Sequence, residues 1–107
     1  MKERIIELFT SLIKYDTTSN SDSKTYPSTE SQFFFAEVLA GMLSSIGMKD
    51  INIDEYSYVT ATLPGNTEGD TIGFISHMDT SPDWCGYGKI DIWRKYVRTF
   101  RRSLQSW

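Results

Sequence analysis

Cysteine and histidine are nearly absent from this sequence, which has one of each, Cys85 and His77. A single cysteine excludes a disulfide within the chain and a cysteine-rich zinc site. Cys85 lacks a second histidine or a recognisable base nearby, and a nucleophilic thiolate needs such activation. We therefore interpret Cys85 as an incidental thiol of a reducing compartment.

Long apolar runs are missing as well. No stretch approaches the ~18 apolar residues of a membrane span. Charges at Glu3, Arg4 and Glu7 interrupt the N-terminal apolar residues too early for a secretory signal. These absences predict a cytoplasmic location and make a membrane partner an unfavoured interpretation.

Basic side chains are scarce in the first part of the chain. Residues 1–83 hold 5 basic and 13 acidic side chains, whereas residues 84–107 hold 6 basic, 1 acidic and all three tryptophans. Because phosphate contacts need clustered Lys and Arg, the net charge of −3 over all 107 residues argues against nucleic-acid binding. The change in composition divides the chain into residues 1–83 and a divergent basic tail, residues 84–107.

Apolar periodicity predicts two helices in the first part. One covers residues 5–13, and a polar, turn-forming stretch with nothing to bury follows it to about Pro27. The second helix begins after Pro27, where the hydroxyl of Ser28 or Thr29 is expected to cap it. It ends at Gly47, which suits a C′ residue in the left-handed region.

Three strands and a candidate third helix are predicted after Gly47. Residues 51–53 and 58–63 read as strands, and residues 71–76 read as a buried strand after a turn. The tail has an apolar stripe opposite Arg and Lys, which is a basic amphipathic helix pattern. It is interpreted either as a surface-binding or partner-binding helix or as accidental amphipathicity, and the second reading is favoured because the pattern is common.

His77 follows the last predicted strand, in the run Ser-His-Met-Asp that ends at Asp79. A lone histidine is more often a hydrogen-bonded structural residue than a metal ligand. A neutral imidazole nevertheless binds Zn²⁺, and a carboxylate such as that of Asp79 accepts its other N–H. A zinc site needs three or four ligands, and spacing alone identifies no others.

Four segments in order carry a family resemblance. Residues 72–83 closely resemble the metal-binding segment of peptidase T, the tripeptide aminopeptidase group of the M20 zinc peptidases. The other three similar segments are residues 15–19, 26–30 and 61–66. The resemblance covers about residues 1–83, and its match over residues 27–30 supports the fold rather than the chemistry.

The resemblance implies an α/β fold, specifically the N-terminal part of a zinc-peptidase catalytic domain with two helices on a partial mixed sheet. It implies that His77 is a zinc ligand and that Asp79 is the catalytic carboxylate that orients this ligand. The family binds two zinc ions, acts on tripeptides and uses a second domain for dimerisation. Its bridging carboxylate, its Glu-Glu pair and its later Asp and His ligands would all lie beyond Trp107.

The match stops after Asp83, where composition also changes, so we expect a truncated or frame-shifted product. Such a piece is expected to be inactive alone and prone to self-association. Two alternatives to an inactive fragment remain open. In the first, the chain is a non-catalytic module for interaction or regulation. In the second, it complements a separately encoded remainder of the enzyme.

Overall fold

The computed structural model describes residues 1–84. The chain divides into two compact units, of which one comprises residues 16–82 and the other residues 1–15 together with 83–107. In the second unit the helix α1 (Lys2–Leu12) is followed by Ile13, whose N–H donates to the carbonyl oxygen of Phe9 at 3.1 Å. This confirms the first predicted helix. Residues 85–107, including Cys85 and nearly all of the predicted basic tail, lie outside the described part.

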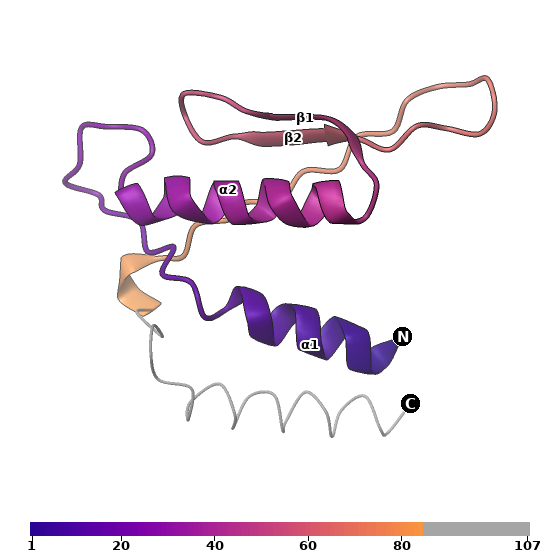
Figure 1. The fold of residues 1–107 in the computed structure, drawn as a ribbon. Helices are drawn as coiled ribbons and strands as arrows, with labels where there is room; N and C mark the ends of the chain where they lie inside the picture. Colours follow the sequence, from indigo (N-terminus) through magenta and orange to yellow (C-terminus); the bar gives the residue numbers. More distant parts are fainter. Residues whose placement is uncertain (85–107) are drawn as a thin grey trace. The chain divides into compact units, whose positions relative to one another are not determined.

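The unit of residues 16–82 is built around helix α2 (Glu30–Ser45) and an antiparallel hairpin, β1 (Lys49–Ile53) and β2 (Val59–Thr62). Figure 1 shows α2 running alongside the two strands, and it packs on both of them. Gln32, Phe35 and Ala36 are buried at the helical spacing i, i+3 and i+4. These elements confirm the α/β class.

The end of α2 follows the sequence-based prediction. Gly47 has a φ of +87°, its N–H donates to the carbonyl oxygen of Ser44 at 3.0 Å, and the N–H of Met48 donates to that of Leu43 at 3.1 Å. This pair of bonds is the Schellman motif, which needs a left-handed residue at C′. The beginning differs, because neither Ser28 nor Thr29 caps α2 through its hydroxyl. Thr29 is the N-cap residue without a side-chain cap bond.

The hairpin confirms the first two predicted strands. Its register pairs Asn52 with Thr60 and Ile53 with Val59, with an irregularity between Lys49 and Asn52. Ile53 and Val59 are half-buried, while Asn52 and Thr60 are exposed. This alternation gives the small sheet one apolar face, as expected for strands covered on one side.

The third predicted strand, residues 71–76, is wrong in two respects. These residues form no strand, and Ile72, Phe74 and Ile75 are 78%, 95% and 101% exposed. A strand needs a neighbour to pair its backbone N–H and C=O groups, and the described sheet contains only β1 and β2. The segment is therefore an extended stretch with large apolar side chains in solvent.

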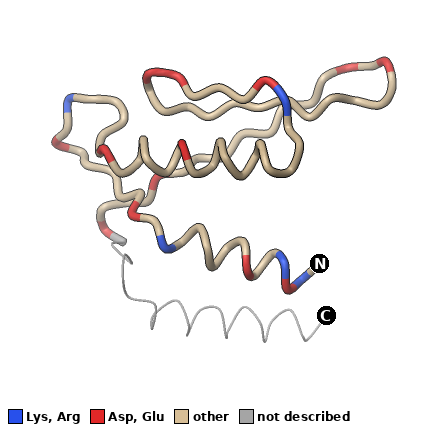
Figure 2. Tube along the Cα trace, in the orientation of Figure 1, with Lys and Arg blue, Asp and Glu red and all other residues tan. Residues whose placement is uncertain are grey.

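Charge is unevenly distributed in the unit of residues 16–82. Ten acidic side chains accompany only two basic ones, Lys24 and Lys49, and Figure 2 shows the acidic residues spread along its loops and helix. Such a surface favours cations over anions. In the described residues 1–84, no helix is both long and apolar enough to cross a membrane.

Candidate functional site

His77 and Asp79 are brought together in the loop after residue 76. The Nδ1 atom of His77 lies 2.9 Å from the carbonyl oxygen of Asp79 and 3.1 Å from its carboxylate Oδ1. A carbonyl oxygen only accepts hydrogen bonds, so Nδ1 must carry the proton that is donated. In the neutral imidazole the lone pair then resides on Nε2, which is the atom available to a metal.

Both side chains of this pair are accessible. The His77 side chain is 85% exposed and that of Asp79 is 48% exposed. A polar contact so open to water contributes little to stability. The contact therefore matters for the orientation of the imidazole more than for the energy of the fold.

The loop is held at its far end by residues 17–19. The N–H of Thr80 donates to the carbonyl oxygen of Thr17 at 3.0 Å, and the N–H of Ser19 donates to the carbonyl oxygen of Thr80 at 2.9 Å. These bonds form an isolated parallel bridge between Thr18 and Thr80. The hydroxyl of Ser19 adds a bond to the Thr80 carbonyl oxygen at 3.1 Å. The position of Asp79 is thus fixed by a segment more than fifty residues earlier.

The 17–19 segment is in turn held by the first turn of α2. The amide nitrogen Nε2 of Gln32 donates to the carbonyl oxygen of Thr17 at 3.3 Å, and the Thr29 hydroxyl donates to that of Thr18 at 3.1 Å. Thr17 and Gln32 are each only 5% exposed. The prediction that this polar stretch has nothing to bury is therefore wrong, since Thr17 is among the most buried residues of the described chain.

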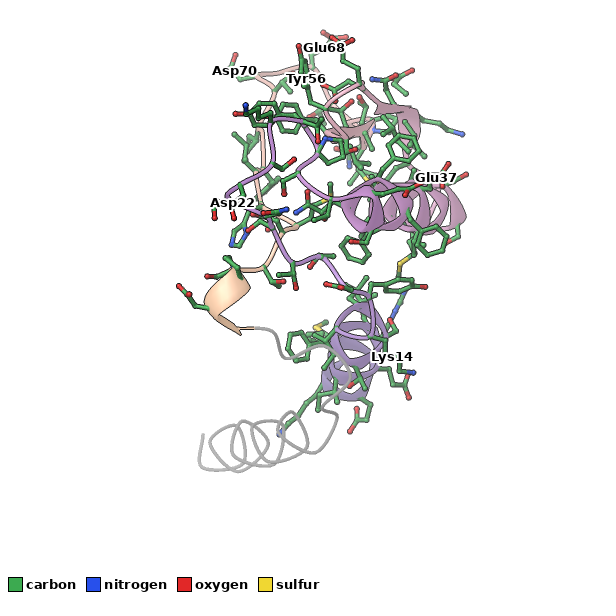
Figure 3. The ribbon with its side chains drawn as sticks, turned by 90° about the vertical axis from the view of Figure 1, so that its left-hand side faces the viewer. Lys14, Asp22, Glu37, Tyr56, Glu68 and Asp70 are labelled. Atoms are coloured by element: carbon green, nitrogen blue, oxygen red, sulfur yellow. The ribbon has the colours of Figure 1, made fainter. Side chains whose placement is uncertain are left out.

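A cleft of about 790 Å³ opens beside the loop. One wall is the hairpin turn, where the Asp54 carboxylate accepts the N–H groups of Tyr56 and Tyr58 at 2.9 and 2.8 Å. Figure 3 labels Tyr56, which comes from this turn. Other residues that line the cleft are His77, Asp79, Phe74, Asn20 and Tyr26. The cleft thus combines aromatic walls with the candidate ligand and its carboxylate.

The hairpin turn also carries a buried hydroxyl. Ser57, in the left-handed region at φ 66°, is fully buried, and its Oγ has no hydrogen-bond partner in the described residues. Its N–H donates to the carbonyl oxygen of Asp54 at 3.0 Å. The sequence analysis gave neither Ser57 nor the tyrosines beside it a role in the site, because no motif marks the turn.

The described residues supply one ligand of a zinc site. His77 offers a single imidazole nitrogen, and Asp79 supplies the acceptor that orients it. Residues 1–84 bring together no group of three or more His, Cys, Asp or Glu side chains of the kind that encloses a metal ion. Further ligands are required before a zinc ion could be held tightly.

The chain is similar to known proteins over most of its length. No family model matches the chain, but curated full sequences do. It is 51% identical over 85 residues to a protein of Caldanaerobacter subterraneus subsp. tengcongensis and 52% identical over 88 residues to one of Bacillus subtilis. A protein of Halothermothrix orenii is 48% identical over 85 residues.

All three relatives are named peptidase T. The matches cover 78 to 80% of this chain but only 21 to 22% of each relative. Over about four fifths of its length, this chain is therefore a homologue of peptidase T, and it spans about a fifth of the length of the curated relatives it matches. The family resemblance predicted from the sequence is confirmed.

Proposed function

We propose that this chain carries part of the active site of a zinc aminopeptidase of the peptidase T type, which releases the N-terminal residue of tripeptides. The observation that carries the proposal is the hydrogen bonding of His77, which leaves Nε2 as the free imidazole nitrogen beside a cleft, in a chain homologous to these peptidases. His77 is the zinc ligand, and Asp79 orients it and contributes its negative charge to the site.

Zinc, when bound, polarises the scissile carbonyl and lowers the pKa of a coordinated water. The described residues prepare this chemistry in two ways. His77 presents a preoriented lone pair, and the Asp79 carboxylate places a negative charge in the lining of the cleft. The aromatic rings of Tyr56 and Tyr58, with centroids 6.2 Å apart, provide apolar contact surface for peptide side chains.

A two-zinc site needs more ligands than these residues supply. The remaining ligands and the general base have to come from elsewhere, from sequence equivalent to the other four fifths of the relatives or from a second chain. We therefore propose that the chain has no tripeptidase activity by itself. Self-association or pairing with a complementary chain is the route by which it would gain activity.

The test compares the chain alone with a chimera that contains the rest of a peptidase T. Zinc binding and tripeptide hydrolysis are measured for the chain alone and for a chimera in which residues 1–83 replace the equivalent segment of the Bacillus subtilis relative. We expect weak zinc binding and no turnover for the chain, and turnover for the chimera. His77→Ala in the chimera should abolish one zinc equivalent and the turnover together. A chimera that retains both after this substitution would refute the assignment of His77.

A further inference from the structure

Gln32 is an amide buried on the apolar face of α2. It lies at 5% exposure on the same face as Phe35 and Ala36, where an amide without hydrogen-bond partners would destabilise the fold. Both polar atoms of its side-chain amide are hydrogen-bonded. Oε1 accepts the N–H of Ser28 at 3.1 Å and its hydroxyl at 3.3 Å, and Nε2 donates to the carbonyl oxygen of Thr17 at 3.3 Å.

The Thr17 carbonyl connects Gln32 to the candidate site. Its oxygen accepts two hydrogen bonds, one from Gln32 Nε2 and one from the N–H of Thr80 at 3.0 Å. The Thr80 N–H and the Asp79 carbonyl belong to the same peptide group. On the other side of that peptide group, the Asp79 carbonyl oxygen accepts from His77 Nδ1 at 2.9 Å.

These hydrogen bonds form one continuous series from α2 to the imidazole of His77. Proceeding from Gln32, it passes through the Thr17 carbonyl and the Asp79–Thr80 peptide group and ends at His77. A hydrogen bond to the N–H of a peptide group fixes the orientation of that group, and it polarises the carbonyl so that the oxygen is a stronger acceptor. Fixing this peptide therefore favours the imidazole tautomer with the proton on Nδ1.

We propose that Gln32 is a positioning residue for His77: through the Thr17 carbonyl it orients the Asp79–Thr80 peptide group, which keeps the His77 lone pair on Nε2. The role in metal binding rests on the proposed function, whereas the effect on the tautomer does not. Gln32 lines the cleft but does not bond His77 itself, and its effect on the imidazole is exerted through backbone groups.

The test uses the full chain without metal. Long-range proton–nitrogen NMR correlations report the His77 tautomer at a pH where the ring is neutral. Gln32→Glu keeps the acceptor for Ser28 but loses the donor to Thr17, and Gln32→Met removes both without adding charge. We expect both variants to shift His77 toward the Nε2–H tautomer. Because only one of them adds a charge, a shared shift is assigned to the lost donor.

Ser31→Ala is the matched control. Ser31 lies one position before Gln32 in α2, and within residues 1–84 its hydroxyl bonds the Thr29 hydroxyl alone, at 3.2 Å, so its removal should leave the tautomer unchanged. Titration with zinc chloride gives the second readout. We expect the Gln32 variants to lose about 10- to 100-fold in zinc affinity, the usual effect of removing the support of a ligand.

Two results would overturn the proposal. One is an unchanged His77 tautomer in a Gln32 variant whose circular dichroism matches that of the unaltered chain. The other needs no variant: a Thr80 amide that exchanges with solvent at the rate of a free peptide, together with a predominant Nε2–H tautomer in the unaltered chain. If zinc fails to bind while the tautomer still responds to Gln32, the positioning role stands and the zinc proposal fails.

Discussion

Thr17 and Thr80 are separated by 63 residues and are joined by both their backbones and their side chains. The Thr80 N–H donates to the Thr17 carbonyl oxygen at 3.0 Å, and the Thr17 hydroxyl donates to that of Thr80 at 3.4 Å. Thr17 lies just after the end of α1, and Thr80 directly follows Asp79. This pairing is what makes the loop of His77 part of the folded unit rather than a free extension.

The hydroxyl pair gives the first prediction. Thr17→Val keeps the volume and β-branching of the buried side chain and removes the 3.4 Å bond, so unfolding should become easier by about 0.5 to 1.5 kcal/mol. Urea denaturation of the full chain measures the change. Thr80→Val and the double variant complete a cycle, and the double variant should lose less than the sum of the two. Strict additivity would show that the hydroxyls do not interact.

Asp79 should matter less for metal binding than His77. In Asp79→Ala the backbone carbonyl still accepts from Nδ1, and only the carboxylate contact at 3.1 Å is lost. We expect the His77 tautomer to persist and zinc affinity to fall by about 10-fold, at the lower end for a supporting residue. His77→Ala should remove the binding altogether. Calorimetric titration with zinc chloride compares the zinc affinity of the two variants with that of the unaltered chain.

Asp70→Ala serves as the control for lost negative charge, because Asp70 is an exposed carboxylate in the turn before residue 71. It should leave zinc affinity nearly unchanged. Equal losses in Asp79→Ala and His77→Ala would contradict the orienting role and identify Asp79 as a direct zinc ligand in this chain.

Two glycines of the α2 region should respond in opposite directions to alanine. Gly47 has a φ of +87°, so Gly47→Ala should destabilise the chain by about 1 to 2 kcal/mol. Gly41 lies inside α2, where a methyl group added to its Cα would meet nothing within 4 Å, so Gly41→Ala should stabilise the chain by about 1 kcal/mol. Urea midpoints measure both. Changes of the same sign would contradict the assigned helix end.

Local chemistry explains which parts of this fold the sequence could predict. The end of α2 depends on one glycine and its neighbours, and β1 and β2 depend on alternation within a few residues. Both predictions are confirmed. His77 and Asp79 stand out by their place after an apolar segment and by family resemblance, and the structure joins them by a hydrogen bond.

Long-range pairing explains the rest. Thr17 and Gln32 look like ordinary loop and helix polar residues, yet both are buried, and Thr17 is bonded to Gln32 and to the distant Thr80. Residues 71–76 have the composition of a buried strand, but composition does not supply the neighbouring strand that such a segment must pair with. The prediction fails there because it rests on an intrinsic preference without its partner.

The exposed segment 71–76 gives the last prediction. Phe74 and Ile75 are fully in solvent, and their backbone groups make no hydrogen bond within residues 1–84, so this apolar segment is open to pairing with a second chain. We expect the full chain to self-associate as its concentration rises, and Phe74→Lys to shift it toward monomer.

Thr67→Lys is the control, because it adds the same charge in the preceding turn without removing an apolar side chain, and it should have a much smaller effect. Sedimentation velocity over a concentration series compares the three proteins. Because charge alone would act equally at both positions, a matching effect of the two lysines would attribute association to net charge. A monomeric unaltered chain with a cooperative melt would contradict association through residues 71–76.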